Sequence, residues 1–357
     1  MGKIKVLICD DSALMRTSLK KIVESSPDLF VVGAARDGVD AVAKARELRP
    51  DVITMDINMP GMDGITALQI IMAENIAPVV MVSSLTQEGA QVTFEAMALG
   101  AFDYVPKPGG TVSVQMGSVA NDIIKKVKAA AKAGTLAKLS RRNHPADNGG
   151  RGAPRAFLKK KKTSISAHGF KAIAMGISTG GPKTLFEVLP FLPGDLNAAI
   201  FLVQHMPPTF TSSFAQRIDA HCPMKCVEAS VGMSVEPGTI YLGKGGSHLM
   251  VHKKADGAMI LRTPNRPEHS FIPSVDIMMS SVLEIFGSDT VGVLMTGMGD
   301  DGADSMVKIS QAGGVTIAES EESAIVFGMP REAIERGGAQ VVTPSWEIAN
   351  QIIKAMK

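Results

Sequence analysis

The sequence is poor in cysteine, in charge of one sign and in long apolar runs. Three cysteines among 357 residues cannot form a disulfide framework, which favours a reducing, cytoplasmic environment. The formal net charge of +2 gives no general reason to expect a nucleic acid or an acidic substrate. No run of about 18 apolar residues occurs, so we predict no membrane insertion. Cys222 and Cys226 lack a second pair of ligands, which argues against a zinc site.

The length of the chain suits two domains, because a single core rarely grows beyond roughly 250–300 residues. Between residues 138 and 163 the composition changes. The charged residues are arginines and lysines apart from the acidic Asp147, and the apolar residues show no periodicity. We interpret this stretch as a solvated hinge, with contact to an acidic partner or nucleic acid as the less favoured alternative. The predicted divisions are a domain over residues 1–120, a helix and basic flexible linker over 121–168, and a second domain over 169–357.

Both domains alternate short apolar runs with amphipathic segments. In the first, Ile4–Cys9 and Val79–Ser83 predict strands, and Gly38–Leu48 has the apolar spacing of a helix. Five such βα units predict a doubly wound, mostly parallel sheet of the α/β class, with ligands at the carboxyl ends of its strands. The alternation resumes at Ala172–Ile177 and predicts a second doubly wound α/β domain, with Thr184–Leu189 as one of its helices. Shorter strands within residues 225–262 predict a small antiparallel insertion in it.

Acidic residues follow two of the predicted strands of the first domain. Asp10 and Asp11 follow Ile4–Cys9, and Asp56 follows the run that ends at Met55. Carboxylates that meet at a sheet edge repel one another, and a hard divalent cation such as Mg²⁺ removes that cost. Asp56 can also act as a nucleophile toward a phosphoryl group, whose charge the metal and an ammonium would stabilise.

Three further groups complete this predicted site. A backbone carbonyl near Asn58 offers Mg²⁺ another oxygen ligand. Lys107, just beyond the last strand of the domain, supplies the ammonium. Ser83, at the end of the fourth strand, can donate its hydroxyl to the phosphate once it forms.

The motifs around these residues resemble those of a bacterial response-regulator receiver domain. They are Cys9-Asp-Asp-Ser12, Met55-Asp-Ile-Asn-Met-Pro60, Val82-Ser-Ser84 and Tyr104-Val-Pro-Lys-Pro108. The resemblance implies a flavodoxin-like fold with a five-stranded parallel sheet, phosphorylation by a sensor histidine kinase, and a cis bond before Pro108. The implied roles are Asp56 as phosphoacceptor, Asp11 as metal ligand, Asp10 as second acid, and Ser83 with Tyr104 as switch pair beside Lys107.

A second set of reactive residues follows strands of the second domain. Gly176-Ile-Ser178-Thr-Gly180 fits the G-x-S-x-G pattern, in which a serine occupies a tight strand-to-helix turn and the following N–H groups can hold an oxyanion. His205 could act as its base, and an aspartate at a third strand end could orient the imidazole. Along the chain the three residues come in the order Ser, His, Asp, whereas an α/β-hydrolase has the order Ser, Asp, His, so that family is disfavoured.

Other interpretations of this set remain open from the residues alone. A glycine-rich turn at a helix start also binds phosphate. The spacing does not choose between Asp300 and Asp301, nor between His205 and the other histidines of the domain, which are His221, His248, His252 and His269.

Three longer motifs resemble the catalytic domain of the chemotaxis protein-glutamate methylesterase family. They are Gly176-Ile-Ser-Thr-Gly-Gly-Pro182, Val203-Gln-His-Met-Pro-Pro208 and Thr296-Gly-Met-Gly-Asp-Asp-Gly302. The resemblance implies Ser178 as nucleophile, His205 as base and Asp301 as orienting acid, with Thr179 and Met298 lining the site and no cofactor for the esterase step. The family demethylates glutamate methyl esters on chemoreceptors and deamidates receptor glutamines. It usually carries His-Arg-Pro-Ser-Val-Asp near the site, where this chain has His269-Ser-Phe-Ile-Pro-Ser-Val-Asp276. The missing arginine bears on how the acidic, helical receptor is bound and on the choice of substrate.

The predicted function is therefore a monomeric, phosphorylation-activated hydrolase of chemotaxis adaptation. Its unphosphorylated receiver would pack over the Ser178 site, and phosphorylation at Asp56 would admit substrate. One rival is a response regulator whose second domain only binds a ligand at the glycine-rich turn. Another is a DNA-binding regulator that uses the basic linker, although no helix-turn-helix is recognisable.

Overall fold

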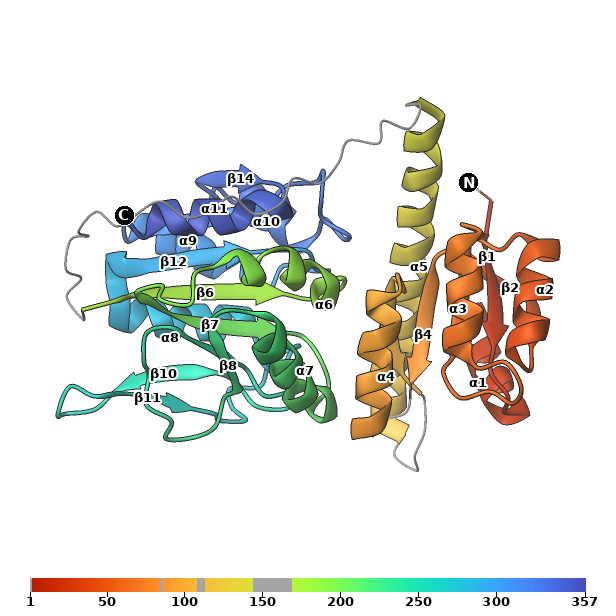
Figure 1. The fold of residues 1–357 in the computed structure, drawn as a ribbon, viewed down its shortest axis with the longest axis horizontal. Helices are drawn as coiled ribbons and strands as arrows, with labels where there is room; N and C mark the ends of the chain where they lie inside the picture. The colour runs from red at the N-terminus through yellow and green to blue at the C-terminus, as the bar shows by residue number, and fades with distance from the viewer. Residues whose placement is uncertain (1, 84–85, 108–112, 144–168) are drawn as a thin grey trace. The chain divides into compact units, whose positions relative to one another are not determined.

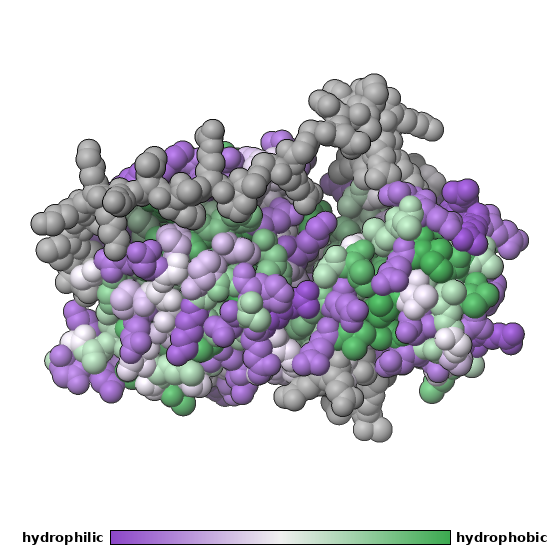
Figure 2. Space-filling model, in the orientation of Figure 1, coloured by the Kyte–Doolittle hydropathy of each residue, from purple (hydrophilic) through white to green (hydrophobic). Residues whose placement is uncertain are grey.

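A computed structural model describes residues 2–83, 86–107, 113–143 and 169–357. The chain divides into two compact units, Met1–Lys162 and Thr163–Lys357. Each unit is a sheet with helices packed against it (Figure 1). Apolar and hydrophilic residues are interspersed on the visible surface of each unit (Figure 2). None of the described helices combines the length and the hydropathy needed to cross a bilayer.

The first unit contains a five-stranded, wholly parallel sheet in the order β2-β1-β3-β4-β5. This order confirms the predicted flavodoxin-like fold. Buried valine, leucine and isoleucine side chains fill the strands, as expected where helices cover both faces. The strands are β1 (Ile4–Cys9), β2 (Leu29–Ala35), β3 (Val52–Asp56), β4 (Val79–Ser83) and β5 (Asp103–Pro106).

Polar side chains start the helices of this unit. Ser12, Asp37, Asp63 and Thr86 each accept a backbone N–H of the first helical turn, which satisfies donors that a helix start leaves free. The last helix reaches Asn143 and so enters the stretch predicted as linker, most of which lies outside the described residues. The helices are α1 (Ala13–Glu24), α2 (Gly38–Leu48), α3 (Gly64–Ala73), α4 (Gln87–Ala98) and α5 (Ser113–Asn143).

The second unit is built on a seven-stranded parallel sheet in the order β14-β13-β12-β6-β7-β9-β8. The small antiparallel insertion is confirmed as the pair β10 (Met250–Lys253) and β11 (Met259–Arg262). The sheet strands are β6 (Lys171–Ile177), β7 (Ala198–Gln204), β8 (Lys225–Glu228), β9 (Thr239–Leu242), β12 (Thr290–Leu294), β13 (Val315–Glu319) and β14 (Val341–Thr343).

The helices of the second unit follow the predicted alternation with one difference. The segment predicted as one helix over residues 184–189 is a short α6 followed by two 3₁₀ turns, because Pro190 lacks the N–H that would continue a helix. These elements are α6 (Gly181–Thr184), η1 (Leu185–Glu187), η2 (Leu189–Phe191), α7 (Pro208–His221), α8 (Val275–Phe286), η3 (Gly287–Asp289), α9 (Ala303–Gln311), α10 (Met329–Glu335) and α11 (Ser345–Ala355).

Candidate functional site

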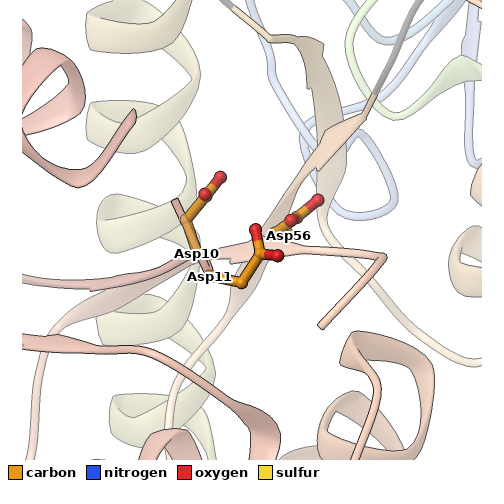
Figure 3. Close-up of side chains that lie close together, drawn as sticks. All are labelled: Asp10, Asp11 and Asp56. Carbon is orange, nitrogen blue, oxygen red and sulfur yellow. The ribbon is translucent and has the colours of Figure 1, made fainter. Parts of the chain in front are cut away.

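The first unit brings three carboxylates together at one edge of its sheet. β1 and β3 are parallel neighbours, with Cys9 beside Met55, so the residues that end or follow them meet. Carboxylate oxygens of Asp10, Asp11 and Asp56 lie within 4.8 Å of one another (Figure 3). Asp10 and Asp56 are buried, whereas Asp11 is exposed.

Lys107 is the cation that the structure places against this cluster. Its Nζ lies 2.7 Å from Asp56 Oδ2 and 3.2 Å from Asp10 Oδ2. Burial raises the pKa of Asp56, an effect that the bond from Lys107 opposes. Burial acts to lower the pKa of Lys107, but its bonds to Asp56 and Asp10 outweigh burial and raise it. Among the described residues Lys107 is the one cation that forms ion pairs with these carboxylates, so they keep excess negative charge, and such an oxygen donor set fits Mg²⁺.

The other residues of the predicted phosphorylation site lie on β4 and β5 or just after β3. The Asn58 backbone N–H bonds to Asp56. Ser83 is buried at the end of β4, where the Thr93 hydroxyl donates to its oxygen at 2.8 Å. Tyr104 is buried on β5, which raises its phenol pKa well above the usual range, and the Lys126 ammonium lies 5.0 Å from its ring centroid. The predicted cis bond before Pro108 lies outside the described residues.

In the second unit, three adjacent strands carry the predicted catalytic residues at their carboxyl ends. β6 pairs with β7 on one side and β12 on the other. Ser178 follows β6, and its N–H donates to the Thr296 carbonyl at 2.9 Å. His205 follows β7, and its N–H donates to the Ile177 carbonyl at 3.2 Å. Asp301 lies between β12 and α9, so all three residues occupy the same edge of one sheet.

Asp301 contacts the His205 imidazole directly. His205 Nε2 lies 2.9 Å from Asp301 Oδ2. The carboxylate is buried and also accepts the Ser274 hydroxyl at 2.8 Å and the backbone N–H groups of Val275 and Asp276 at 2.7 and 3.0 Å. Burial acts to raise the pKa of Asp301, but the bonds from His205 and these N–H groups outweigh it, and the pKa falls below its usual value. Asp301 is therefore ionised at neutral pH.

This contact fixes which imidazole nitrogen can accept a proton. A carboxylate can only accept, so in the neutral imidazole the hydrogen sits on Nε2 and Nδ1 carries the lone pair. His205 Nδ1 is buried and has no hydrogen-bond partner within the described part of the chain. The Ser178 hydroxyl thus does not bond to it in this arrangement, although Nδ1 is free to take a proton.

Phe271 lies flat against the His205 imidazole and was not predicted to belong to the site. The ring centroids of His205 and Phe271 are 4.3 Å apart, and the planes are inclined by 5°. The stacked ring fixes the orientation of the imidazole. Phe271 belongs to the segment in which this chain departs from the family pattern, and that departure was the one signal in the sequence that pointed to it.

The turn that carries Ser178 requires glycine where the G-x-S-x-G pattern has it. Gly180 has a φ of 81°, which L-residues with a side chain rarely adopt, and a Cβ there would approach Ile325 Cβ to 2.7 Å. Gln204 Nε2 donates to the Ser178 carbonyl at 2.9 Å, which fixes the turn against β7. Thr179 is buried within this turn, and Met298 is half-buried on the loop between β12 and α9.

The structure also separates residues between which the sequence could not choose. Asp300 is exposed and accepts Arg336 Nη2 at 2.7 Å, so Asp301 is the carboxylate at His205. His248 is buried, and its Nδ1 accepts the Ser274 N–H at 3.2 Å. It therefore helps to place the segment that binds Asp301. The exposed His221 bonds to a carbonyl of its own helix.

Comparison with known proteins assigns both units to families. Residues 173–352 match the model of the CheB methylesterase, and residues 6–115 match the response regulator receiver domain. A protein-glutamate methylesterase/protein-glutamine glutaminase of Syntrophomonas wolfei is 59% identical over 356 residues, which are 99% of each chain. One from Caldanaerobacter subterraneus is 49% identical over 99% of this chain and 96% of its own.

A solved structure agrees with these matches. The crystal structure of the Thermotoga maritima CheB methylesterase catalytic domain is 38% identical to this chain, covers 52% of it and 98% of itself, and superposes with a TM-score of 0.51. The chain therefore belongs to the CheB methylesterase family of hydrolases and carries a response regulator receiver domain.

Proposed function

We propose that this protein is a cytoplasmic hydrolase of chemotaxis adaptation that removes methyl groups from glutamate methyl esters of chemoreceptors and deamidates receptor glutamines. The names of its relatives support both activities. The single observation that carries the proposal is the buried contact between His205 and Asp301 at the sheet edge where Ser178 stands. We take residues 1–120 as the receiver domain, 121–168 as helix and linker, and 169–357 as the catalytic domain.

In the proposed reaction, Ser178 Oγ attacks the ester carbonyl while its proton passes to His205 Nδ1. The charged imidazole is stabilised by Asp301 at Nε2, and the face of Phe271 fixes its orientation. The Ser178 N–H is already bonded to Thr296, so we assign the oxyanion to the backbone N–H groups of Thr179 and Gly180.

Collapse of the tetrahedral intermediate breaks the bond to the methoxy oxygen, which takes the proton from His205 and leaves as methanol. Water, deprotonated by His205 Nδ1, then attacks the glutamyl ester of Ser178. This second attack releases the glutamate side chain and returns the proton to Ser178 Oγ. A glutamine follows the same two steps with ammonia as the leaving group.

The first unit would control this reaction through Asp56. A receiver domain implies Mg²⁺-dependent phosphorylation, and Mg²⁺ held by Asp11 and Asp56, with Asp10 and the Asn58 carbonyl, would offset the charge of the phosphoryl group. Lys107 stabilises the same charge, and Ser83 and Tyr104 respond to it. The partners are a sensor histidine kinase and the receptor substrate, and we propose that the protein acts as a monomer.

The test is to incubate the full chain with methylated receptor, with and without a small phosphodonor, and to measure methanol and ammonia together. Release should rise with the phosphodonor and disappear in Ser178→Ala. Full activity in a folded Ser178→Ala variant would rule out the proposed nucleophile. Binding of receptor without any release of methanol or ammonia would rule out hydrolysis.

A further inference from the structure

A carboxylate is buried directly behind the nucleophile turn. Glu319 ends β13 and is 0% exposed. Its Oε2 accepts the Thr296 N–H at 2.7 Å, and its Oε1 accepts the Ser323 hydroxyl at 2.8 Å. No cation forms an ion pair with it within the described part of the chain. Both oxygens of Glu319 accept hydrogen bonds, as the ionised form of a carboxyl group does.

Thr296 connects this carboxylate to the nucleophile. The Thr296 carbonyl accepts the Ser178 N–H at 2.9 Å, and its hydroxyl donates to the Thr179 carbonyl at 2.9 Å. The same hydroxyl accepts the Val326 N–H at 2.9 Å. One residue thus fixes two consecutive positions of the nucleophile turn, and Glu319 fixes the backbone of that residue.

The charge of Glu319 changes close to neutral pH. Burial raises its pKa from 4.5 to about 7, although the bonds from Ser323 and Thr296 oppose the rise. The charge of Glu187 raises the pKa further, and Glu187 itself accepts the Ser345 hydroxyl at 2.6 Å. Ser345 in turn donates its N–H to the Ser323 hydroxyl at 2.8 Å. Glu321 and Glu322, next along the chain, are exposed.

We propose that Glu319 is a positioning residue for Ser178, and that its ionised form holds Thr296 and the nucleophile turn in the reactive arrangement. The inference rests on the proposed role of Ser178 as nucleophile. A proton on Glu319 turns one of its oxygens into a donor toward the Ser323 hydroxyl, and the Thr296 N–H is left with a neutral acceptor in place of an ionised one. Bonds to an ionised acceptor are also the stronger ones. Because Glu319 is fully buried, it acts on kcat and leaves KM unchanged.

The experiment compares kcat and KM for methanol release from methylated receptor by the full chain and by Glu319→Gln across the pH range. Glutamine keeps an oxygen for the Thr296 N–H but cannot ionise. We expect kcat of the variant to be about 5–10-fold below wild type near pH 9 and within about 2-fold near pH 6, where both side chains are neutral. The ratio of the two kcat values cancels every titration that both proteins share.

The exposed carboxylate Glu321 provides the matched control, and Glu321→Gln should follow wild type at every pH. A ratio that stays constant with pH, or a change confined to KM, would overturn the inference. If Glu319→Gln does not fold, Ser323→Ala replaces it. Losing the Ser323 bond should move the rise in kcat to higher pH, and an unchanged profile would refute the role of Glu319. Absence of methanol release by wild type would instead contradict the proposed function.

Discussion

The substitution Asp301→Asn tests how the catalytic imidazole is held. Oδ2 of Asp301 accepts His205 Nε2 and the Val275 N–H, and Oδ1 accepts the Ser274 hydroxyl and the Asp276 N–H. An asparagine amide has one oxygen, so its NH₂ group faces two donors whichever way it turns. With the NH₂ group at the Oδ2 position, the His205 imidazole loses its acceptor. With the NH₂ group at the Oδ1 position, the side chain loses the hydrogen bonds from Ser274 and Asp276 that hold the acceptor in place.

The expected loss can be worked from these contacts. A triad whose histidine holds the wrong tautomer loses about 10⁴-fold in kcat, which corresponds to about 5.5 kcal/mol of barrier. Buried donors without an acceptor cost about 1–3 kcal/mol each, so we expect the free energy of unfolding to fall by about 2–4 kcal/mol. The variant should thus fold near room temperature but turn over about 10³–10⁴ times more slowly.

The assay is methanol release from methylated receptor at saturating substrate, with urea unfolding as the measure of stability. The matched control is Asp300→Asn, because Asp300 is exposed and pairs with Arg336 rather than His205. Its activity should stay within about 2-fold of wild type, as for other surface ion pairs. A folded Asp301→Asn variant that loses less than about 10-fold in kcat would refute the reasoning.

Three further predictions concern other residues. Asp56→Asn should abolish stimulation by a small phosphodonor while basal methanol release is kept; loss of the basal rate in a folded variant would contradict a purely regulatory role. Phe271→Leu removes a stacked ring worth about 0.5–1.5 kcal/mol and should lower kcat about 2–10-fold, whereas Phe271→Tyr should retain activity; equal rates for both variants would count against the stacking. The stabilising effect of protonated Glu319 is fully present below pH 4.5 and is lost as pH rises to its folded pKa of about 7. One unit of pKa corresponds to about 1.36 kcal/mol, so wild type should lose about 3 kcal/mol of unfolding free energy relative to Glu319→Gln as the pH rises from 4.5 to above 7. Urea unfolding curves that show no such difference would mean that the pKa is not raised.

The fold could be predicted because its signals are local. Most strands of the first unit are short apolar runs, and α2 begins and ends at the predicted residues. The difference at residues 184–189 also has a local cause, which is Pro190. The predicted antiparallel insertion is limited to β10 and β11, because β8 and β9 pair in parallel with the main sheet.

The sequence offers Ser178 and His205 as candidates, but the choice of His205 and Asp301 rests on the family resemblance, and their catalytic roles stay predictions. The sequence does not name the residues that hold them. Ser178 and His205 stand directly after apolar runs, where parallel strands place functional groups. Phe271 reaches His205 from a loop without regular structure, and Glu319 acquires its burial only when β13 packs inside the sheet. Such contacts depend on tertiary packing, which no local pattern encodes.

Labelling with a fluorophosphonate followed by peptide mass mapping tests the central claim most directly, because the reagent forms a stable bond only with an activated serine. The account predicts a single adduct, on Ser178, whose rate of formation collapses in His205→Ala and rises when the receiver is phosphorylated. An enzyme that hydrolyses receptor methyl esters yet leaves Ser178 unlabelled, or that labels equally fast without His205, would contradict it.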